Sequence, residues 1–287
     1  MKRASQERTV DTRSVEAVRA QAIQVFKRLF PKSDSRYINK AFDWAEAAFS
    51  GRYADFQAID AKYHDFEHTL QGTLCYVTLL DGYQRAGAQP PLSARMFELA
   101  VIAILLHDTG YLKKRDDRQG TGAKYTLTHV NRSADFAARL LGENNFDASE
   151  IRAVQNMIRC TGVNADLKSI PFQSELERKL GFALGTADLL GQMAAGDYVD
   201  KLEILFQEFD EANHFSHRTT GPGVFKSVGE LRRNTPAFWE KYVIPKINGD
   251  FIGLYHFLEG PHGENLYLTR IKANIERLKD ELDGVPA

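Results

Sequence analysis

An apolar run of eight residues that ends in an adjacent His-Asp pair most constrains how this chain can fold. The run covers residues 99–106, and His107 and Asp108 follow it directly. It is too short to cross a bilayer, so it indicates a helix that is buried in the core of the protein. A carboxylate carried into a core needs a partner or a metal, because an unpaired buried charge is very costly. The run therefore predicts a helical core with a polar site at its end.

Helical spacing of apolar residues continues through most of the chain, whereas strand signals are weak. Apolar side chains recur three and four positions apart in the segments 15–29, 65–83, 96–107 and 271–282. Ser93 can cap the helix that carries 96–107, and Asp147 with Glu150 and Ser174 with Glu177 have the spacing of two further helix starts. The glycine-rich stretch 219–228 predicts a loop. These features predict an all-α fold.

The simplest organisation is a compact multi-helix bundle with a helical extension at each end. We expect an N-terminal arm at 1–35, a core at 36–205 and a C-terminal extension at 206–287. The arm can pack on its own core or on a second subunit. The extension should pack on the core to bury four aromatic side chains, Phe238, Trp239, Tyr242 and Phe251.

Composition excludes some partners and compartments. The 287 residues carry a formal net charge of -1, which argues against capture of long nucleic acid. Cys75 and Cys160 form no CxxC pair, so we expect two buried thiols in a reducing compartment. No segment has the pattern of a targeting signal or a membrane span. We therefore expect a cytoplasmic protein that does not bind membranes.

Two further elements carry residues of the kind found in the His-Asp pair. His64 and His68 are four apart, and on one helix they would share a face. Asp188 follows an apolar helical segment and has small neighbours. Each element also has an alternative explanation when it is taken singly. His64 and His68 could be surface or capping histidines, the His-Asp pair could form a hydrogen bond at a helix end, and Asp188 could lie on a helix surface. Taken together, imidazoles and carboxylates in one pocket are ligands for a divalent metal.

The order of these elements resembles the HD-domain superfamily of metal-dependent phosphohydrolases, and most closely its cyclic-nucleotide phosphodiesterase branch. The resemblance covers roughly residues 60 to 195. Its motifs are Tyr63-His64-Asp65-x-x-His68, the pair His107-Asp108, His129 with Ser133, and Ala187-Asp188-Leu189.

The resemblance implies a role for each of these residues. His68, His107, Asp108 and Asp188 would hold one metal, for which Mn, Fe, Zn, Co or Ni are suitable. Asp108 would also bridge to a weaker second site for Mg or Mn, near His129. His64 would act as general acid toward the leaving oxygen. The implied catalytic residues are thus His64, Asp108 and His129.

Three positions depart from the family pattern. Tyr111 and Lys113 stand where that branch has a histidine and a glycine, and Asp65 replaces an asparagine. No match to that branch's purine-binding glutamine and aromatic clamp is visible. Lys113 and Lys114 are candidates for contact with substrate phosphate, with a solvated charged loop as the alternative. A lid over the pocket is a further hypothesis for the segment that holds His214, His217 and Arg218.

The expected function is hydrolysis of a small phosphorylated substrate of nucleotide type, with phosphodiesters favoured because His64 is present. Three alternatives remain: a phosphomonoesterase at the same site, a di-iron oxygenase of the same fold, and a metal-binding regulatory module. Oligomerisation is compatible with the sequence.

Overall fold

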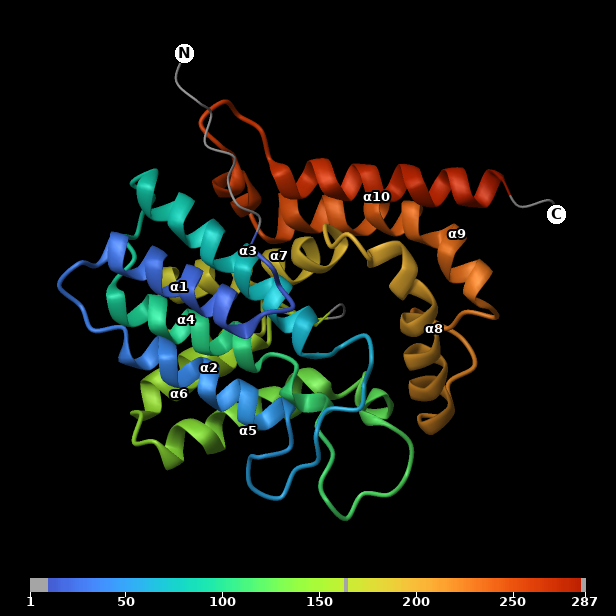
Figure 1. Cartoon of the computed structure of the whole chain (residues 1–287), viewed down its shortest axis with the longest axis horizontal. Helices are drawn as coiled ribbons and strands as arrows, with labels where there is room; N and C mark the ends of the chain where they lie inside the picture. Colours follow the sequence, from blue (N-terminus) through green and yellow to red (C-terminus); the bar gives the residue numbers. More distant parts are fainter. Residues whose placement is uncertain (1–9, 163–164, 285–287) are drawn as a thin grey trace.

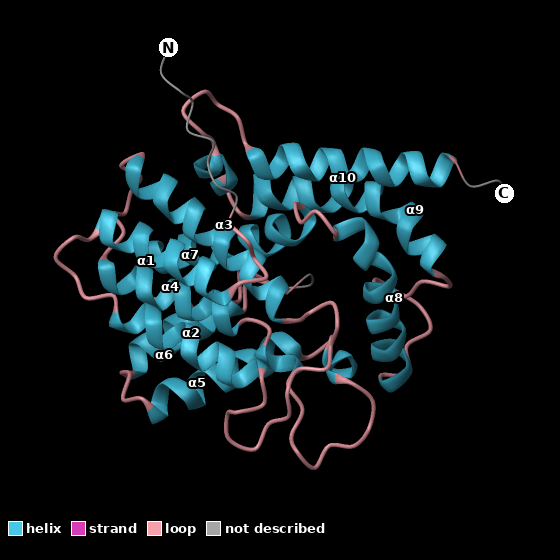
Figure 2. Ribbon diagram, viewed as in Figure 1, coloured by secondary structure: helices cyan, strands magenta, loops and turns pink. Residues whose placement is uncertain are grey.

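The computed structural model describes residues 10–162 and 165–284, and the regular secondary structure of this part of the chain is helical, with loops between the helices (Figure 1, Figure 2). The all-α prediction is confirmed. The described residues hold no strand, and only isolated bridges join loop residues. The α-helices are α1 (Val15–Leu29), α2 (Arg36–Phe49), α3 (Phe66–Arg85), α4 (Ala94–Leu106), α5 (His129–Glu143), α6 (Ala148–Ile158), α7 (Glu175–Met193), α8 (Tyr198–Phe215), α9 (Val228–Phe238) and α10 (Leu266–Asp283). Short 3-10 and π turns lie between them: η1 (Thr109–Tyr111), η2 (Gly122–Tyr125), η3 (Trp239–Val243), η4 (Lys246–Asp250) and η5 (Leu254–Leu258).

Helix α4 is the centre of the bundle. Every residue from 97 to 106 is buried, and the helix packs against α2, α3, α6 and α7. The apolar run therefore forms a core helix, as its composition predicts. The helix ends at Leu106, so His107 and Asp108 leave it at the inner end of the core.

Capping side chains set the starts of several helices. Ser93 accepts a hydrogen bond from the backbone N–H of Met96 at the start of α4. Asp147 begins α6 with a complete capping box, and Ser174 begins α7. Each satisfies N–H groups that the first helical turn leaves without a partner. These three predictions are confirmed.

Helices α3 and α7 cross in backbone contact, and this crossing positions the site. A Cβ on Gly191 would lie 2.9 Å from the carbonyl oxygen of Gln71 and 2.9 Å from the Cα of Gly72. Only glycine permits so close an approach at this point. His68 lies one turn before Gly72, and Asp188 lies one turn before Gly191, so the crossing brings the two side chains together.

Both ends of the chain pack on the central helices. Helix α1 buries Val18, Val25 and Phe26 and lies against α3, so the N-terminal helix packs on its own core. Helix α10 lies along α7 and α9 (Figure 1). Trp239 and Phe251 are buried, but Phe238 is 36% exposed. The expectation that Phe238 is buried is wrong, because its side chain faces the cavity described below.

Three other features bear on the sequence predictions. Helix α8 runs without interruption through residues 205 and 206, so the predicted limit between the core and the C-terminal extension falls inside a helix. Cys75 and Cys160 are buried free thiols. No helix within 10–162 or 165–284 combines the length and the apolar character that a membrane crossing requires.

Candidate metal centre

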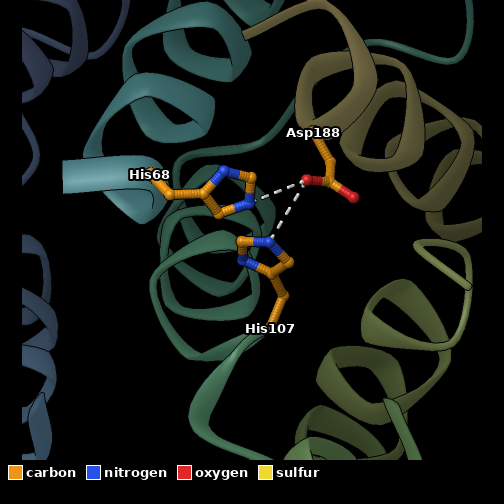
Figure 3. Close-up of side chains that lie close together, drawn as sticks. All are labelled: His68, His107 and Asp188. Carbon is orange, nitrogen blue, oxygen red and sulfur yellow. Dashed lines mark ion pairs between the residues drawn. The ribbon is translucent and has the colours of Figure 1, made fainter. Parts of the chain in front are cut away.

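Two histidines and two aspartates from separate elements meet at the inner end of α4. His68 comes from the first turn of α3, and Asp188 comes from the middle of α7. His68 Nε2 and His107 Nε2 each lie 3.4 Å from Asp188 Oδ1 (Figure 3). Each of these nitrogens also lies 3.2 Å from Asp108 Oδ2. The structure thus brings together all four residues to which the family pattern gives a metal-ligating role.

The donor atoms of this cluster fit a metal ion. His107 Nδ1 lies 2.7 Å from the carbonyl oxygen of Ile104. A carbonyl can only accept, so Nδ1 carries the proton and Nε2 presents its lone pair to the cluster. His107 Nε2 and Asp108 Oδ2 are both buried without a hydrogen-bond partner. Unsatisfied buried nitrogen and oxygen atoms that converge on one point indicate a site for a cation.

Electrostatics in the cluster lead to the same conclusion. Burial by itself would lower the pKa of His68, but Asp108 and Asp188 raise it to about 10. Burial would likewise raise the pKa of Asp108, yet the neighbouring His107 and His68 hold it well below its ordinary value. Without an ion, the two carboxylates therefore hold a proton on an imidazole between them. A divalent cation can replace that proton.

His64 approaches the same pocket, but it does not lie on a helix with His68. Helix α3 begins at Phe66, and His64 lies in the preceding loop. The prediction that both histidines share a helical face is therefore wrong, although their ring centroids are only 5.3 Å apart. The helix begins after Asp65, because the carboxylate of Asp65 caps α3 by accepting from the N–H of His68 at 2.8 Å. Asparagine and aspartate are equivalent in this capping role.

Glu208 holds His64 in place, although no pattern in the sequence points to this residue. Its Oε2 lies 2.6 Å from His64 Nδ1, and its Oε1 accepts from the N–H of Tyr63 at 2.7 Å. Burial would raise the pKa of Glu208, but the charge and hydrogen bond of His64 lower it. The Glu208 carboxylate thus fixes the orientation of the His64 ring from its Nδ1 side. Helix α8 carries several acidic residues, and nothing local to the sequence marks this one.

Tyr111 lies between two imidazole rings. Its ring stacks on His64 with a centroid separation of 4.4 Å and on His129 with 4.6 Å. His129 Nδ1 donates to the carbonyl oxygen of Thr126, and its Nε2 lies 3.9 Å from Asp108 Oδ1. Burial is the main reason that the pKa of His129 is lowered. His129 is therefore neutral at pH 7, with its lone pair turned toward Asp108.

Gly110 permits a close contact between the turn after α4 and the start of α5. Helix α4 ends before His107, and Gly110 lies in the 3-10 turn η1 rather than closing the helix. A Cβ at this position would collide with the carbonyl oxygen of His129. The N–H of Gly110 also donates to Ser133 Oγ at 2.8 Å. Gly110 therefore lets α5 approach the His-Asp turn, which brings His129 to the cluster.

Lys113 and Lys114 do not reach the site. Lys113 is buried and pairs with Asp60 at 2.8 Å. Lys114 pairs with Asp55 at 2.7 Å and lies over the ring of Phe56. Neither residue lines the cavity, so the prediction that they contact substrate is not supported by their positions. Both side chains fasten the loop that follows η1.

A cavity of about 790 Å³ opens from the cluster. Its floor contains His64, His68, Asp108, His129 and Asp188, and α8 and α9 form the opposite wall. The basic residues that line it are Arg159, Arg218 and Lys241. Arg218 thus belongs to the cavity wall, whereas the exposed His214 and His217 of the proposed lid do not line it.

The fold and the cluster define an all-helical protein with a candidate divalent-metal centre at the floor of a large cavity. The profile of the Npun_R2479-like family matches residues 12–279, and the chain belongs to that family. The matched region runs from before α1 into α10 and includes every residue of the cluster. A comparison with curated proteins found no match. The family name states no activity, so the functional argument rests on the site.

Proposed function

We propose that this protein is a metal-dependent phosphohydrolase of the HD-domain type, with a preference for phosphodiesters. The observation that carries the proposal is the convergence of His68, His107, Asp108 and Asp188, with the unpartnered Nε2 of His107 aimed into the cluster. The order of these residues along the chain is that of the HD superfamily. A divalent ion held by them would polarise a phosphoryl oxygen and make a water molecule acidic enough to attack.

His64 supports the preference for diesters. Its Nδ1 is engaged by Glu208, so in the protonated ring Nε2–H is the group that can donate to substrate. When water adds to phosphorus, the bond between phosphorus and the leaving oxygen breaks. His64 would give its proton to that oxygen, which then departs as an alcohol rather than an alkoxide. A general acid of this kind contributes roughly 100-fold or more when the leaving group is a poor one.

Metal content and hydrolysis, measured on the same samples, test the proposal. Wild type reconstituted with Mn is expected to bind metal and cleave bis(p-nitrophenyl) phosphate, and Asp108→Ala is expected to do neither. Asp210→Ala, which removes an exposed carboxylate from α8, is the matched control and should behave as wild type. Metal bound without any phosphoester hydrolysis would contradict the activity. Absence of metal from reconstituted wild type would contradict the metal centre itself.

A further inference from the structure

One wall of the cavity is an apolar face of α8, part of which is packed in the core and part of which is open to the cavity. Tyr198, Leu202, Leu205, Phe209 and Ala212 line the cavity from α8. They follow each other at spacings of four and three, which places them on one side of the helix. An apolar stripe of this kind normally packs against another element. Here Leu205 and Phe209 are partly exposed to the cavity, whereas Tyr198, Leu202 and Ala212 are buried.

The apolar surface continues beyond α8. Leu189 and Met193 of α7 line the cavity next to Asp188. Phe225, Leu231 and Phe238 extend it on the side of α9. Large aromatic and aliphatic side chains turned to an open space favour a ligand that removes them from water.

The polar residues of the lining offer little to read a nucleobase. Nine of them already donate a hydrogen bond to the protein itself, mostly to backbone carbonyls: Thr126, Arg159, Thr161, Ser169, Gln192, Asn213, Arg218, Asn234 and Thr235. A site that selects a base needs convergent donors and acceptors that the protein leaves available. In this lining, each of those nine side chains already gives a donor to the protein, whereas Leu205, Phe209 and Phe238 turn apolar surface to the cavity.

From these observations we propose that the cavity binds the linear hydrocarbon part of an amphipathic phosphoester, whose phosphate lies at the His-Asp cluster. The inference rests on the proposed function for the position of the phosphate. It replaces the nucleotide-type substrate that the family resemblance implied. From Leu202 to Ala212 the stripe extends about 15 Å at the rise of an α-helix, which matches an extended chain of about twelve carbons.

Binding of alkylphosphonates by calorimetry tests this assignment without any turnover. Butyl-, octyl- and dodecylphosphonate are compared below their micelle concentrations, on Mn-loaded wild type and on metal-free wild type. Affinity is expected to rise roughly two- to fourfold for each added methylene in both forms, because each methylene buries apolar surface. Equal affinities for all three chains would overturn the inference, as would tighter binding of cyclic adenosine monophosphate than of dodecylphosphonate.

A matched pair of variants locates the chain in the cavity. Leu205→Trp fills space on the cavity side of α8, and Gln207→Trp adds the same ring at an exposed position on that helix. Leu205→Trp is expected to weaken dodecylphosphonate binding about tenfold and to leave butylphosphonate unchanged, with no effect from Gln207→Trp. An unchanged dodecylphosphonate affinity in Leu205→Trp would contradict the assignment. Phe209→Leu keeps the inference testable if Leu205→Trp does not fold. It leaves the wall apolar and enlarges the cavity, and it should still bind long chains more tightly than short ones.

The two proposals fail separately. Chain-length-dependent binding by a protein that hydrolyses no phosphoester would uphold the hydrocarbon site and overturn the hydrolase. Hydrolysis of phosphodiesters at rates independent of chain length would uphold the hydrolase and overturn the hydrocarbon site.

Discussion

Glu208 Oε2 lies 2.6 Å from His64 Nδ1 although the two residues are 144 positions apart in the chain. Glu208 belongs to α8, whereas His64 belongs to the loop before α3. Their contact fastens the cavity wall to the candidate centre. It also fixes which nitrogen of His64 can face a substrate.

Loss of this contact is expected to depend on the leaving group. In Glu208→Gln, hydrolysis of diesters with an alkoxide leaving group should fall about 10- to 100-fold, the usual cost of losing a carboxylate that orients a histidine. Hydrolysis of p-nitrophenyl esters should change little, because p-nitrophenolate leaves without a proton. Steady-state kinetics on the two substrate types measure the difference. Equal losses on both would show that Glu208 acts through the fold and not through His64, and Glu203→Gln on the exposed face is the control.

Metal binding is expected to stabilise the folded protein. With metal at about 100 times its Kd, the free energy of unfolding should increase by about 2.7 kcal/mol, because the ion binds the folded cluster alone. That increase corresponds to a rise in Tm of about 4–5 °C for a chain of this length. Thermal scans of wild type with and without Mn measure it. Asp188→Asn should lose this response, and a full response in that variant would remove Asp188 from the ligand set.

Metal affinity is expected to increase with pH. The pKa of His68 in the metal-free protein is about 10, and that of His107 is also raised, so an incoming ion must displace protons across the neutral range. Binding should release roughly one to two protons, and the affinity should rise about tenfold per pH unit for each. Calorimetry in two buffers of different ionisation enthalpy counts the protons. A Kd that does not change between pH 6.5 and 8.5 would contradict this reading.

The same raised pKa has the opposite consequence for the stability of the metal-free fold. Because folded His68 holds its proton more tightly than the unfolded chain does, its contribution is complete below about pH 6.5. The contribution is lost as the pH rises toward 10. Denaturant titrations of metal-free wild type and His68→Gln should therefore converge as the pH is raised. A gap of constant size would show that His68 stabilises the fold by packing and not by its charge.

The glycine at the crossing of α3 and α7 gives a test of the geometry. Gly191→Ala should destabilise the protein by about 1–3 kcal/mol and weaken metal binding, because its Cβ would push α3 away from α7. Gly142→Ala in α5 is the control, since a Cβ there meets no atom within 4 Å. That change should stabilise the helix by about 0.5–1 kcal/mol. Denaturant unfolding and metal titration of both variants check the contrast, and similar effects at the two sites would contradict the close crossing.

Local sequence signals were sufficient for most of the helical fold. Caps such as Ser93 and Asp147 act within one turn, so they are readable without knowing what the helix packs against. The apolar run of α4 identified the core helix for the same reason. His107 and Asp108 followed from it, because a buried carboxylate restricts what can surround it.

Signals that depend on tertiary contact could not be read in this way. Glu208 is one carboxylate among several on α8, and only folding selects the one that meets His64. Lys113 and Lys114 follow the His-Asp turn closely, but side chains in a loop can point in any direction, and both turn to aspartates instead. The spacing of His64 and His68 alone cannot show that the first lies before the cap of α3 and the second after it.

Different helices carry the cluster and line the cavity, and this separation affects how the binding preference of such a protein can change. The four residues of the cluster come from α3, from α7 and from the end of α4, and α8 contributes none of them. The face of α8 that lines the cavity can therefore exchange one apolar side chain for another without moving a ligand. The choice of bound molecule can thus vary independently of cation binding, and a library confined to positions 205 and 209 would alter the first while retaining the second.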